Sequence, residues 1–288
     1  MNTSTPARNP VVWGWDQVRA AVAGLEAARH HELDHSVPRI RALTGADLRE
    51  ALLAGYDDFR ADHTHYLFMC AIYPVIGLIL GQAASGAGAL HLIFPLAAGF
   101  ALLGPFAAVG LYELSLRRER GEDVAWWHAF AVFRAPNFGA ILKLGLALTA
   151  LFVLWLIAAE GIWRLTLGRF APASPGELLG MVLGTRIGWV LMLVGNGVGF
   201  LFALAALVLG VISFPMMVDR QVGVELAVRT SFEAVRANKA VFAGWGIVVA
   251  ATLLAGSVPF LIGLAVAIPV LGHATWHLYR RAVGFTAG

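Results

Sequence analysis

Long apolar stretches constrain the fold of this chain more than any other feature of its sequence. They lie at about 66–82, 91–114, 140–162, 187–217 and 240–257, and a sixth follows the turn at Val258 and runs to about Tyr279. An apolar stretch of about 20 residues is long enough to cross a bilayer as a helix. In lipid every backbone N–H and C=O group must be bonded within the protein, which favours helices. The sequence therefore predicts an all-α polytopic membrane protein with six transmembrane helices.

The composition agrees with the membrane class. The 288 residues are 59% hydrophobic and 14% charged, whereas soluble domains have roughly 25% charged residues. The net charge is +3, but basic residues of membrane proteins gather in cytoplasmic loops, and no groove-reading motif accompanies them. We therefore expect no nucleic acid among the partners. The polar opening segment has no apolar core of a signal peptide, and we divide the chain into a cytoplasmic segment 1–43, a membrane domain 44–284 and a tail 285–288.

A short pattern of apolar residues followed by Arg-Ala occurs three times. At helical spacing it reads Leu52, Tyr56, Phe59, Arg60, then Trp126, Phe130, Phe133, Arg134, and then Val228, Phe232, Val235, Arg236. The apolar region after each copy ends in an arginine with a glycine three residues later, at Arg118, Arg220 and Arg281. The sequence predicts three repeats of an interfacial amphipathic helix plus a transmembrane hairpin. Thr44 and Asp47 form a capping box that begins the first such helix.

The basic residues predict the orientation of the chain. On this topology 18 of the 21 lysines and arginines lie on one side, and only Arg164, Arg169 and Arg186 lie on the other. The positive-inside rule then places both termini in the cytoplasm.

Small residues four positions apart are typical of helix contacts in lipid, because they let two backbones approach closely. Such pairs are Gly77 with Gly81, Gly184 with Gly188, and Gly195 with Gly199. Asn196, near the middle of the fourth span, is expected to form a hydrogen bond across a helix pair, and a ligand contact is the alternative. We expect these glycines to pack within a six-helix bundle, and a homodimer seam is the alternative.

His273 and His277 lie one helical turn apart near the end of the last span. This spacing is compatible with a haem or a transition metal. No helix offers a clear third ligand, so hydrogen bonds to Glu113, Asp219 or the backbone are the favoured interpretation, and no cofactor is predicted. The motifs of familiar enzymes are absent, so a non-enzymatic protein is expected. Arg60, Arg134 and Arg236 are candidates for contact with lipid headgroups.

Several strings together resemble an uncharacterised bacterial integral-membrane family, domain of unknown function 2189. They lie at 73–78, 94–102, 104–106, 110–114, 117–121, 188–189, 194–196, 230–231 and 269–280, within a resemblance that spans about 37–283. The resemblance implies a multi-pass protein of the bacterial inner membrane without an established activity. Some members have names that link them to cytochrome c oxidase. A fainter likeness, over 231–238, is to the membrane domain attached to some glycerophosphodiester phosphodiesterases.

Three hypotheses about function follow from the sequence. The first is a non-enzymatic scaffold, accessory subunit or assembly factor of a larger membrane complex, which the resemblance connects with respiration. The alternative is a protein that binds or transports a lipid or small amphiphile through Arg60, Arg134 and Arg236. The second alternative is a haem- or metal-binding protein that uses His273 and His277.

Overall fold

The computed structural model describes residues 37–61, 89–168, 172–258 and 261–286, together with the single positions 19, 82 and 170. Three of the described helices are long and apolar enough to cross a membrane: Phe138–Thr166, Arg186–Asp219 and Lys239–Ser257. The first is α8. The second consists of α10 (Arg186–Gly210) and α11 (Ser213–Asp219), and the third is α13. The predicted all-α membrane class is therefore supported, whereas the sixfold span count and the repeat stay predictions, since the first expected span lies outside the described residues.

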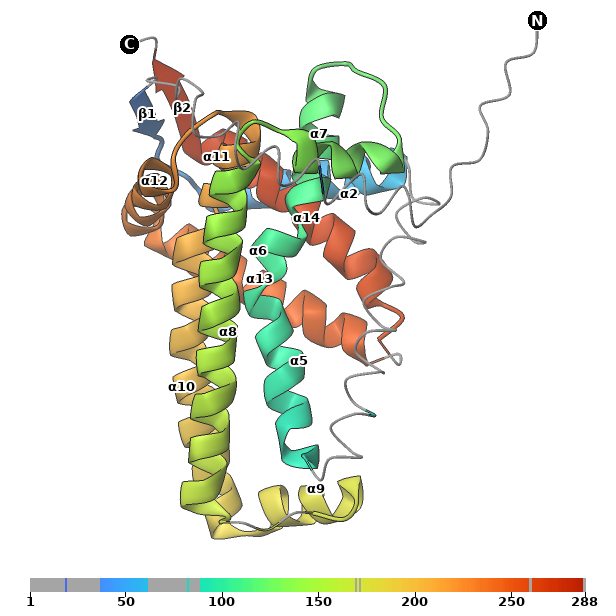
Figure 1. The fold of residues 1–288 in the computed structure, drawn as a ribbon, viewed down its shortest axis with the longest axis vertical. Helices are drawn as coiled ribbons and strands as arrows, with labels where there is room; N and C mark the ends of the chain where they lie inside the picture. Colours follow the sequence, from blue (N-terminus) through green and yellow to red (C-terminus); the bar gives the residue numbers. More distant parts are fainter. Residues whose placement is uncertain are drawn as a thin grey trace, which may run out of the picture.

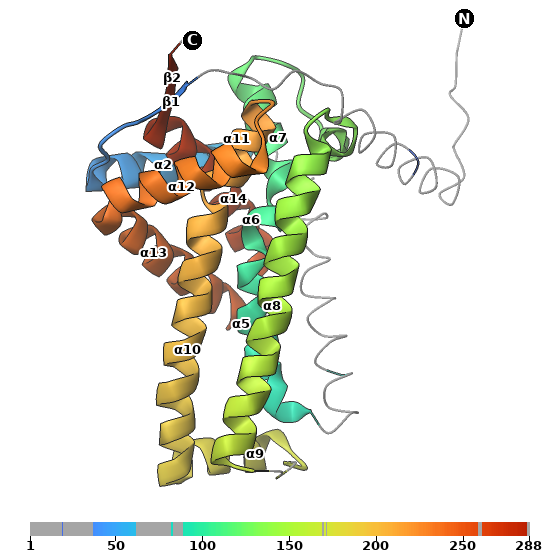
Figure 2. The same ribbon diagram turned by 60° about the vertical axis from the view of Figure 1, so that its left-hand side comes forward.

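The longest axis of the molecule is that of α8 and α10, which lie side by side (Figures 1 and 2). One end carries both strands and several short helices. We call it the strand end, and the opposite end carries α9 (Pro175–Gly184). Helix α9 lies between the third and fourth apolar stretches, where no span was predicted. Ser174 accepts a hydrogen bond from the backbone N–H of Glu177 (3.2 Å), and Glu177 accepts one from the N–H of Ala173 (2.7 Å), so Ser174 is a side-chain N-cap of this helix.

The second apolar stretch is not one continuous helix. It is divided into η1 (Leu90–Leu92), α5 (Ile93–Leu102), α6 (Gly104–Ala107) and α7 (Val109–Glu119). Pro105 stands in the first turn of α6, where a missing N–H costs least, so the chain restarts a helix there instead of continuing the previous one. Two breaks, at Leu103 and Ala108, thus interrupt this apolar stretch. The fourth stretch breaks in the same way between α10 and α11, just before Pro215.

Two of the three expected interfacial elements are α-helices. They are α2 (Gly45–Ala61) and α12 (Val224–Ala237), and the predicted capping box begins α2, with the Thr44 N–H 2.8 Å from Asp47 Oδ2. The third element is η2 (Trp126–Arg134), a 3₁₀ helix. In a 3₁₀ helix, side chains three positions apart lie above one another, and the rings of Phe130 and Phe133 stack with their centres 6.1 Å apart. Ala135 is extended because Pro136 excludes the helical conformation before it.

Helices α13 and α14 (Leu264–Ala282) form a hairpin that is strongly tilted against α8 and α10. Their facing ends lie near the middle of α8 and not at the level of α9 (Figures 1 and 2). Gly256 and Gly263 bring these ends together, since a Cβ on Gly263 would lie 2.7 Å from the Gly256 Cα. Large apolar side chains of the hairpin are exposed: Ile247, Leu254, Val258 and Ile262. Helix α14 is not among the three candidate spans.

A two-stranded sheet closes the fold at the strand end. Strand β1 (Val37–Ile40) precedes α2, and β2 (Val283–Thr286) continues from α14 in the antiparallel direction. The sequence pattern did not predict either strand, because each is only 4 residues long. The pairing joins the segment before α2 to the segment after α14, so the two helices are held together at one end.

Asparagines placed just after η2 and α12 bond to backbone that is far away in the sequence. The Asn137 side-chain amide donates to the carbonyl oxygens of Met217 (2.9 Å) and Arg220 (3.1 Å) at the end of α11. Asn238 accepts from the N–H of Leu43 (2.7 Å) and donates to the carbonyl oxygen of Arg41 (3.0 Å). Each asparagine thus fixes the segment that leads into another interfacial helix.

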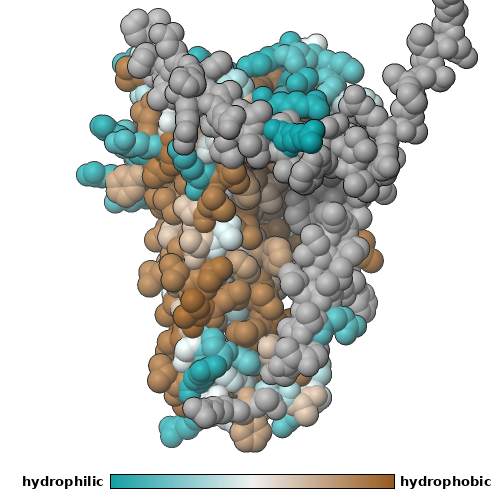
Figure 3. Space-filling view, in the orientation of Figure 1, coloured by the Kyte–Doolittle hydropathy of each residue, from teal (hydrophilic) through white to brown (hydrophobic). Residues whose placement is uncertain are grey.

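The surface of α8 and α10 is apolar over most of their length. Figure 3 shows a hydrophobic belt between hydrophilic residues at the strand end and at the α9 end. Such a belt is what the hydrocarbon core of a membrane requires of a protein surface. Exposed large apolar side chains of α8 and α10 in this region include Leu146, Leu154, Ile157, Leu193, Phe200 and Leu201.

Candidate functional site

The histidine pair singled out in the sequence lies in a polar cluster at the strand end. We call it the Asp58 centre, and it consists of Asp58 on α2, Ser115 and Arg118 on α7, and His273 and His277 on α14. Asp58 is 8% exposed, Ser115 is 1% exposed and His273 is fully buried. Burial of this kind requires that the polar groups satisfy one another.

The hydrogen bonds of the Asp58 centre converge on one carboxylate. Ser115 donates its hydroxyl proton to Asp58 Oδ2 (2.7 Å), and His277 Nε2 lies 3.0 Å from the same oxygen. Arg118 Nη1 lies 3.3 Å from Asp58 Oδ1 and donates to the Asp58 carbonyl oxygen (3.0 Å). His273 Nδ1 lies 2.7 Å from Ser115 Oγ. Because the hydroxyl proton points to the carboxylate, His273 is assigned the tautomer that donates from Nδ1.

This geometry joins three helices and does not activate a nucleophile. In a Ser-His-Asp triad the imidazole accepts the serine proton, whereas here the carboxylate accepts it. Ser115 is also too deeply buried for a substrate to reach it. The Asp58 centre is therefore suited to holding α2, α7 and α14 in one arrangement.

The expected partners of the histidines were wrong in detail. Glu113 pairs with Arg117 (2.8 Å) on its own helix, and Asp219 contacts the last turn of α14 instead. Asp58 and Ser115 lie 219 and 158 positions from the histidines that they bond. Among the residues that the structure describes, no group of three or more His, Cys, Asp or Glu side chains is placed to hold a metal ion.

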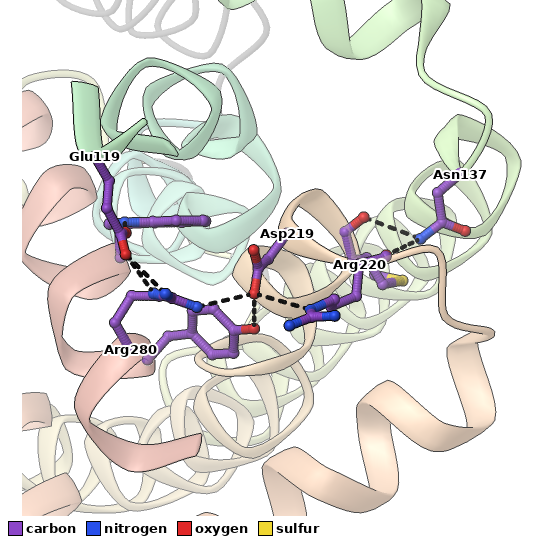
Figure 4. A network of polar contacts seen from close by, with 8 residues as sticks. Glu119, Asn137, Asp219, Arg220 and Arg280 are labelled. Atoms are coloured by element: carbon purple, nitrogen blue, oxygen red, sulfur yellow. Dashed lines mark hydrogen bonds and ion pairs between the residues drawn. The ribbon is translucent and has the colours of Figure 1, made fainter. Parts of the chain in front are cut away.

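A second polar cluster at the strand end, the Arg280 network, is shown in Figure 4. Arg280 forms an ion pair with Glu119 at 2.7 Å and another with Asp219 at 3.2 Å. Tyr279 donates its hydroxyl proton to Asp219 (2.7 Å), and the Trp276 indole donates to Glu119 (3.2 Å). The network thus joins the ends of α7, α11 and α14. In the sequence, each of these ends carries the repeated arginine with a glycine three residues later, at Arg118, Arg220 and Arg281.

In the Asp58 centre the pKa values of Asp58 and His273 are both lowered from their ordinary values. Burial raises the pKa of Asp58, but hydrogen bonds from His277 and Ser115 outweigh this effect and lower that pKa to about 2. Burial lowers the pKa of His273 to about 3, which keeps the ring neutral. His273 lies in the part of α14 that packs on α2 and α7, outside the three candidate spans.

We expect the stability of the protein to fall between pH 6.5 and pH 5 because of His273. The unfolded chain takes up a proton near pH 6.5, while the folded protein does so only near pH 3. Stability is therefore complete above pH 6.5 and decreases below it, by up to about 1.4 kcal/mol per pH unit. Asp58 adds a loss only below pH 3.8. Thermal unfolding in detergent at pH 8, 6 and 5 should show a smaller decrease for His273→Gln, and equal decreases would contradict this assignment.

The predicted headgroup arginines lie at similar places in their elements. Arg60, Arg134 and Arg236 each stand in the last turn of their element, in α2, η2 and α12 respectively, and all three are exposed. Exposed aromatic rings accompany them: Tyr56, Trp127, Phe133 and Phe232. The three arginines belong to separate elements of the strand end, and the structure does not bring them to one pocket.

The predicted helix-packing glycines differ from one another in their surroundings. A Cβ on Gly188 would lie 2.2 Å from the Val182 carbonyl oxygen, and one on Gly199 would lie 3.0 Å from the Trp155 ring. At Gly184 and Gly195 no described atom lies within 4 Å of such a Cβ. Asn196 is exposed, and its amide donates to the Met192 carbonyl oxygen (2.7 Å) of its own helix rather than across a helix pair. Gly77 and Gly81 lie outside the described residues.

Three apolar helices of spanning length, the exposed hydrophobic belt and the polar strand end define a helical integral membrane protein. Residues 93–219 match the model of the family described as "Predicted integral membrane protein (DUF2189)", so the resemblance inferred from the sequence is confirmed over this stretch. The match begins with α5 and ends with α11. No curated protein and no solved structure matches the chain.

Proposed function

We propose that the protein is a non-enzymatic accessory subunit or assembly factor that binds another membrane protein through the exposed face of α10. The observation that carries this proposal is Asn196, an exposed amide near the middle of α10, in the apolar belt. A primary amide has two donors and a carbonyl acceptor, and the described residues satisfy only one donor. Exposing the second N–H and the carbonyl oxygen of this amide to hydrocarbon is unfavourable, whereas a helix of a partner protein can form hydrogen bonds with them.

The surroundings of Asn196 support a helix partner. At helical spacing Leu193, Gly197 and Phe200 share its face, and Leu193 is 79% exposed and Phe200 65% exposed. No described atom lies within 4 Å of a Cβ built on Gly197. A partner backbone can therefore approach closely at Gly197 while the apolar side chains on either side pack against it.

The test is a pull-down of the tagged protein from native membranes in mild detergent, with mass spectrometry of the eluate. We expect a stoichiometric partner, whose recovery falls about threefold to tenfold with Asn196→Leu and further with Gly197→Leu. Ile157→Ala, an exposed position on α8, is the matched control and should leave recovery unchanged. If both α10 variants recover the partner as well as the wild type does, α10 is not the binding site. Recovery of only a second, differently tagged copy would make the protein a homodimer.

A lipid or small amphiphile is the second candidate ligand, because Arg60, Arg134 and Arg236 stand next to exposed aromatic rings at the strand end. Basic side chains beside half-buried aromatic rings suit the headgroup region. If the eluate contains the protein alone with bound lipid, the triple change of these arginines to Gln should remove that lipid. Lipid retained by the triple variant would exclude this role.

Haem or metal binding by His273 and His277 has less support, because Ser115 and Asp58 already engage both rings. An absorption spectrum and metal analysis of the same eluate test it, with His273→Ala/His277→Ala as the control.

For the orientation, we propose that the strand end faces the cytoplasm from the inner membrane. Most described basic residues lie at that end, whereas the α9 end carries Arg164 and Arg186. A fluorescent protein fused to the C-terminus should then fold and fluoresce, and an active alkaline phosphatase fusion at the same place would reverse the orientation.

A further inference from the structure

A small cleft lies at the two-stranded sheet, apart from the Asp58 centre and the Arg280 network. Its volume is about 370 Å³, and it is lined by Arg39, Ile40, Arg41, Gly284, Phe285 and Thr286. Figure 1 places β1 and β2 at the outer edge of the strand end, beyond the level of α2 and α12. The cleft is therefore on the polar side of the molecule, where a charged ligand can approach it.

The backbone pairing brings two arginines around one glycine. Arg39 stands directly opposite Gly284 in the antiparallel register, and the Arg41 N–H donates to the Ala282 carbonyl oxygen (2.8 Å), which extends the ladder by one step. Arg39 and Arg41 are two positions apart, so their side chains leave the strand on the same face. Two guanidinium groups are thus directed to the same side of the sheet.

Gly284 provides the space that the Arg41 guanidinium occupies. A Cβ on this residue would lie 2.8 Å from Arg41 Nη2 and 3.0 Å from Arg41 Nε. Gly284 has no positive φ, so the strand itself does not require glycine at this position. Glycine at this position instead leaves room for the Arg41 guanidinium, which lies over the Gly284 backbone at the border of the cleft.

No described acidic side chain is paired with Arg39 or Arg41. Neighbouring arginines have acidic partners: Arg281 pairs with Glu50 (3.0 Å), and Arg220 lies 3.6 Å from Asp219. Within the described part of the chain, neither Arg39 nor Arg41 forms an ion pair. Arg220 adds a third cation beside the cleft, since its guanidinium lies 4.5 Å from the centre of the Phe285 ring.

We propose that this cleft binds a phosphate group through Arg39 and Arg41. A guanidinium donates two parallel hydrogen bonds that match the spacing of phosphate oxygens, and two guanidiniums on one face suit a di-anion better than a singly charged carboxylate. The phosphate can belong to a soluble compound or to the headgroup of an anionic lipid, because the chemistry at the cleft is the same.

Binding of inorganic pyrophosphate and of detergent-solubilised phosphatidic acid to the full-length protein, measured by isothermal titration calorimetry, tests the proposal. We expect at least one of the two to bind, and Arg39→Gln/Arg41→Gln to weaken that binding about tenfold or more. Pyrophosphate binding identifies a soluble ligand, whereas binding of phosphatidic acid alone identifies a lipid headgroup.

Gly284→Ala separates the geometry of the cleft from its charge. The added methyl group displaces the flexible end of Arg41 and keeps every charge, so the protein should fold and bind several-fold more weakly. Arg49→Gln, an exposed arginine on α2 outside the cleft, is the matched control and should bind as the wild type does. The proposal is overturned if neither compound binds, or if Arg39, Arg41 and Gly284 can be changed without effect.

Discussion

Gly55→Ala is expected to destabilise the protein by about 3 kcal/mol or more. Helices α2 and α14 touch at this point through their backbones, and a Cβ on Gly55 would lie 2.4 Å from the Ala274 N and 2.6 Å from its Cα. No side chain can rotate away to make room, so the two helices must separate. The separation also stretches the hydrogen bond between Asp58 and His277 and the ion pair between Glu50 and Arg281, which lie on either side of Gly55.

The measurement is thermal unfolding in detergent, in which 3 kcal/mol corresponds to a midpoint lower by about 6 to 12 °C. Gly45→Ala is the matched control, because Gly45 begins the same helix and no described atom lies within 4 Å of its Cβ position. It should be neutral or slightly stabilising. A midpoint for Gly55→Ala within about 2 °C of the control would show that the two helices do not pack in this way.

Asp58→Ala is the second change with a large expected effect, again a loss of about 3 kcal/mol. It removes the acceptor of Ser115 and His277 and the counter-charge of Arg118 in one step. Side chains that stay buried without partners then carry the full cost of desolvation. Thermal unfolding in detergent measures this loss of stability as well. Its cause differs from that at Gly55, because the shorter alanine side chain creates no steric clash.

Asp57→Ala is the control for this experiment, since Asp57 is the neighbouring residue of the same type and is exposed. It should change the midpoint by about 1 °C or less. A double-mutant cycle of Asp58→Ala with Ser115→Ala should give a coupling energy of about 1 kcal/mol or more. Additive effects of the two changes would mean that the Asp58 centre does not act as a unit.

Local sequence signals predicted some of the helices of this protein closely. The Thr44 and Asp47 pair marks the start of α2, and the apolar stretch at 240–257 corresponds to α13 within one residue. Helix α9 carries an equally clear signal in Ser174, Pro175 and Glu177, but it lies between the predicted spans and was not predicted. The 3₁₀ form of η2 and the breaks around α6 depend on packing and on single prolines, and periodicity does not report either of them.

The polar clusters were not predictable from the sequence in the same way. His273 and His277 stood out by their spacing, but their partners Ser115 and Asp58 carry no motif and come from distant parts of the chain. Only the packing of α2 and α7 against α14 brings them together. The basic cleft likewise exists only because β1 and β2 pair, and strands of 4 residues leave almost no trace in a sequence pattern.

The short hairpin of α13 and α14 makes the protein unequal in the two halves of a bilayer. If α8 and α10 cross the membrane, the hairpin adds cross-section on the side of the strand end, because its facing ends lie near the middle of α8 (Figures 1 and 2). Among the described helices, the side toward the strand end is therefore the wider one, and it should displace more lipid from its leaflet than the other side does.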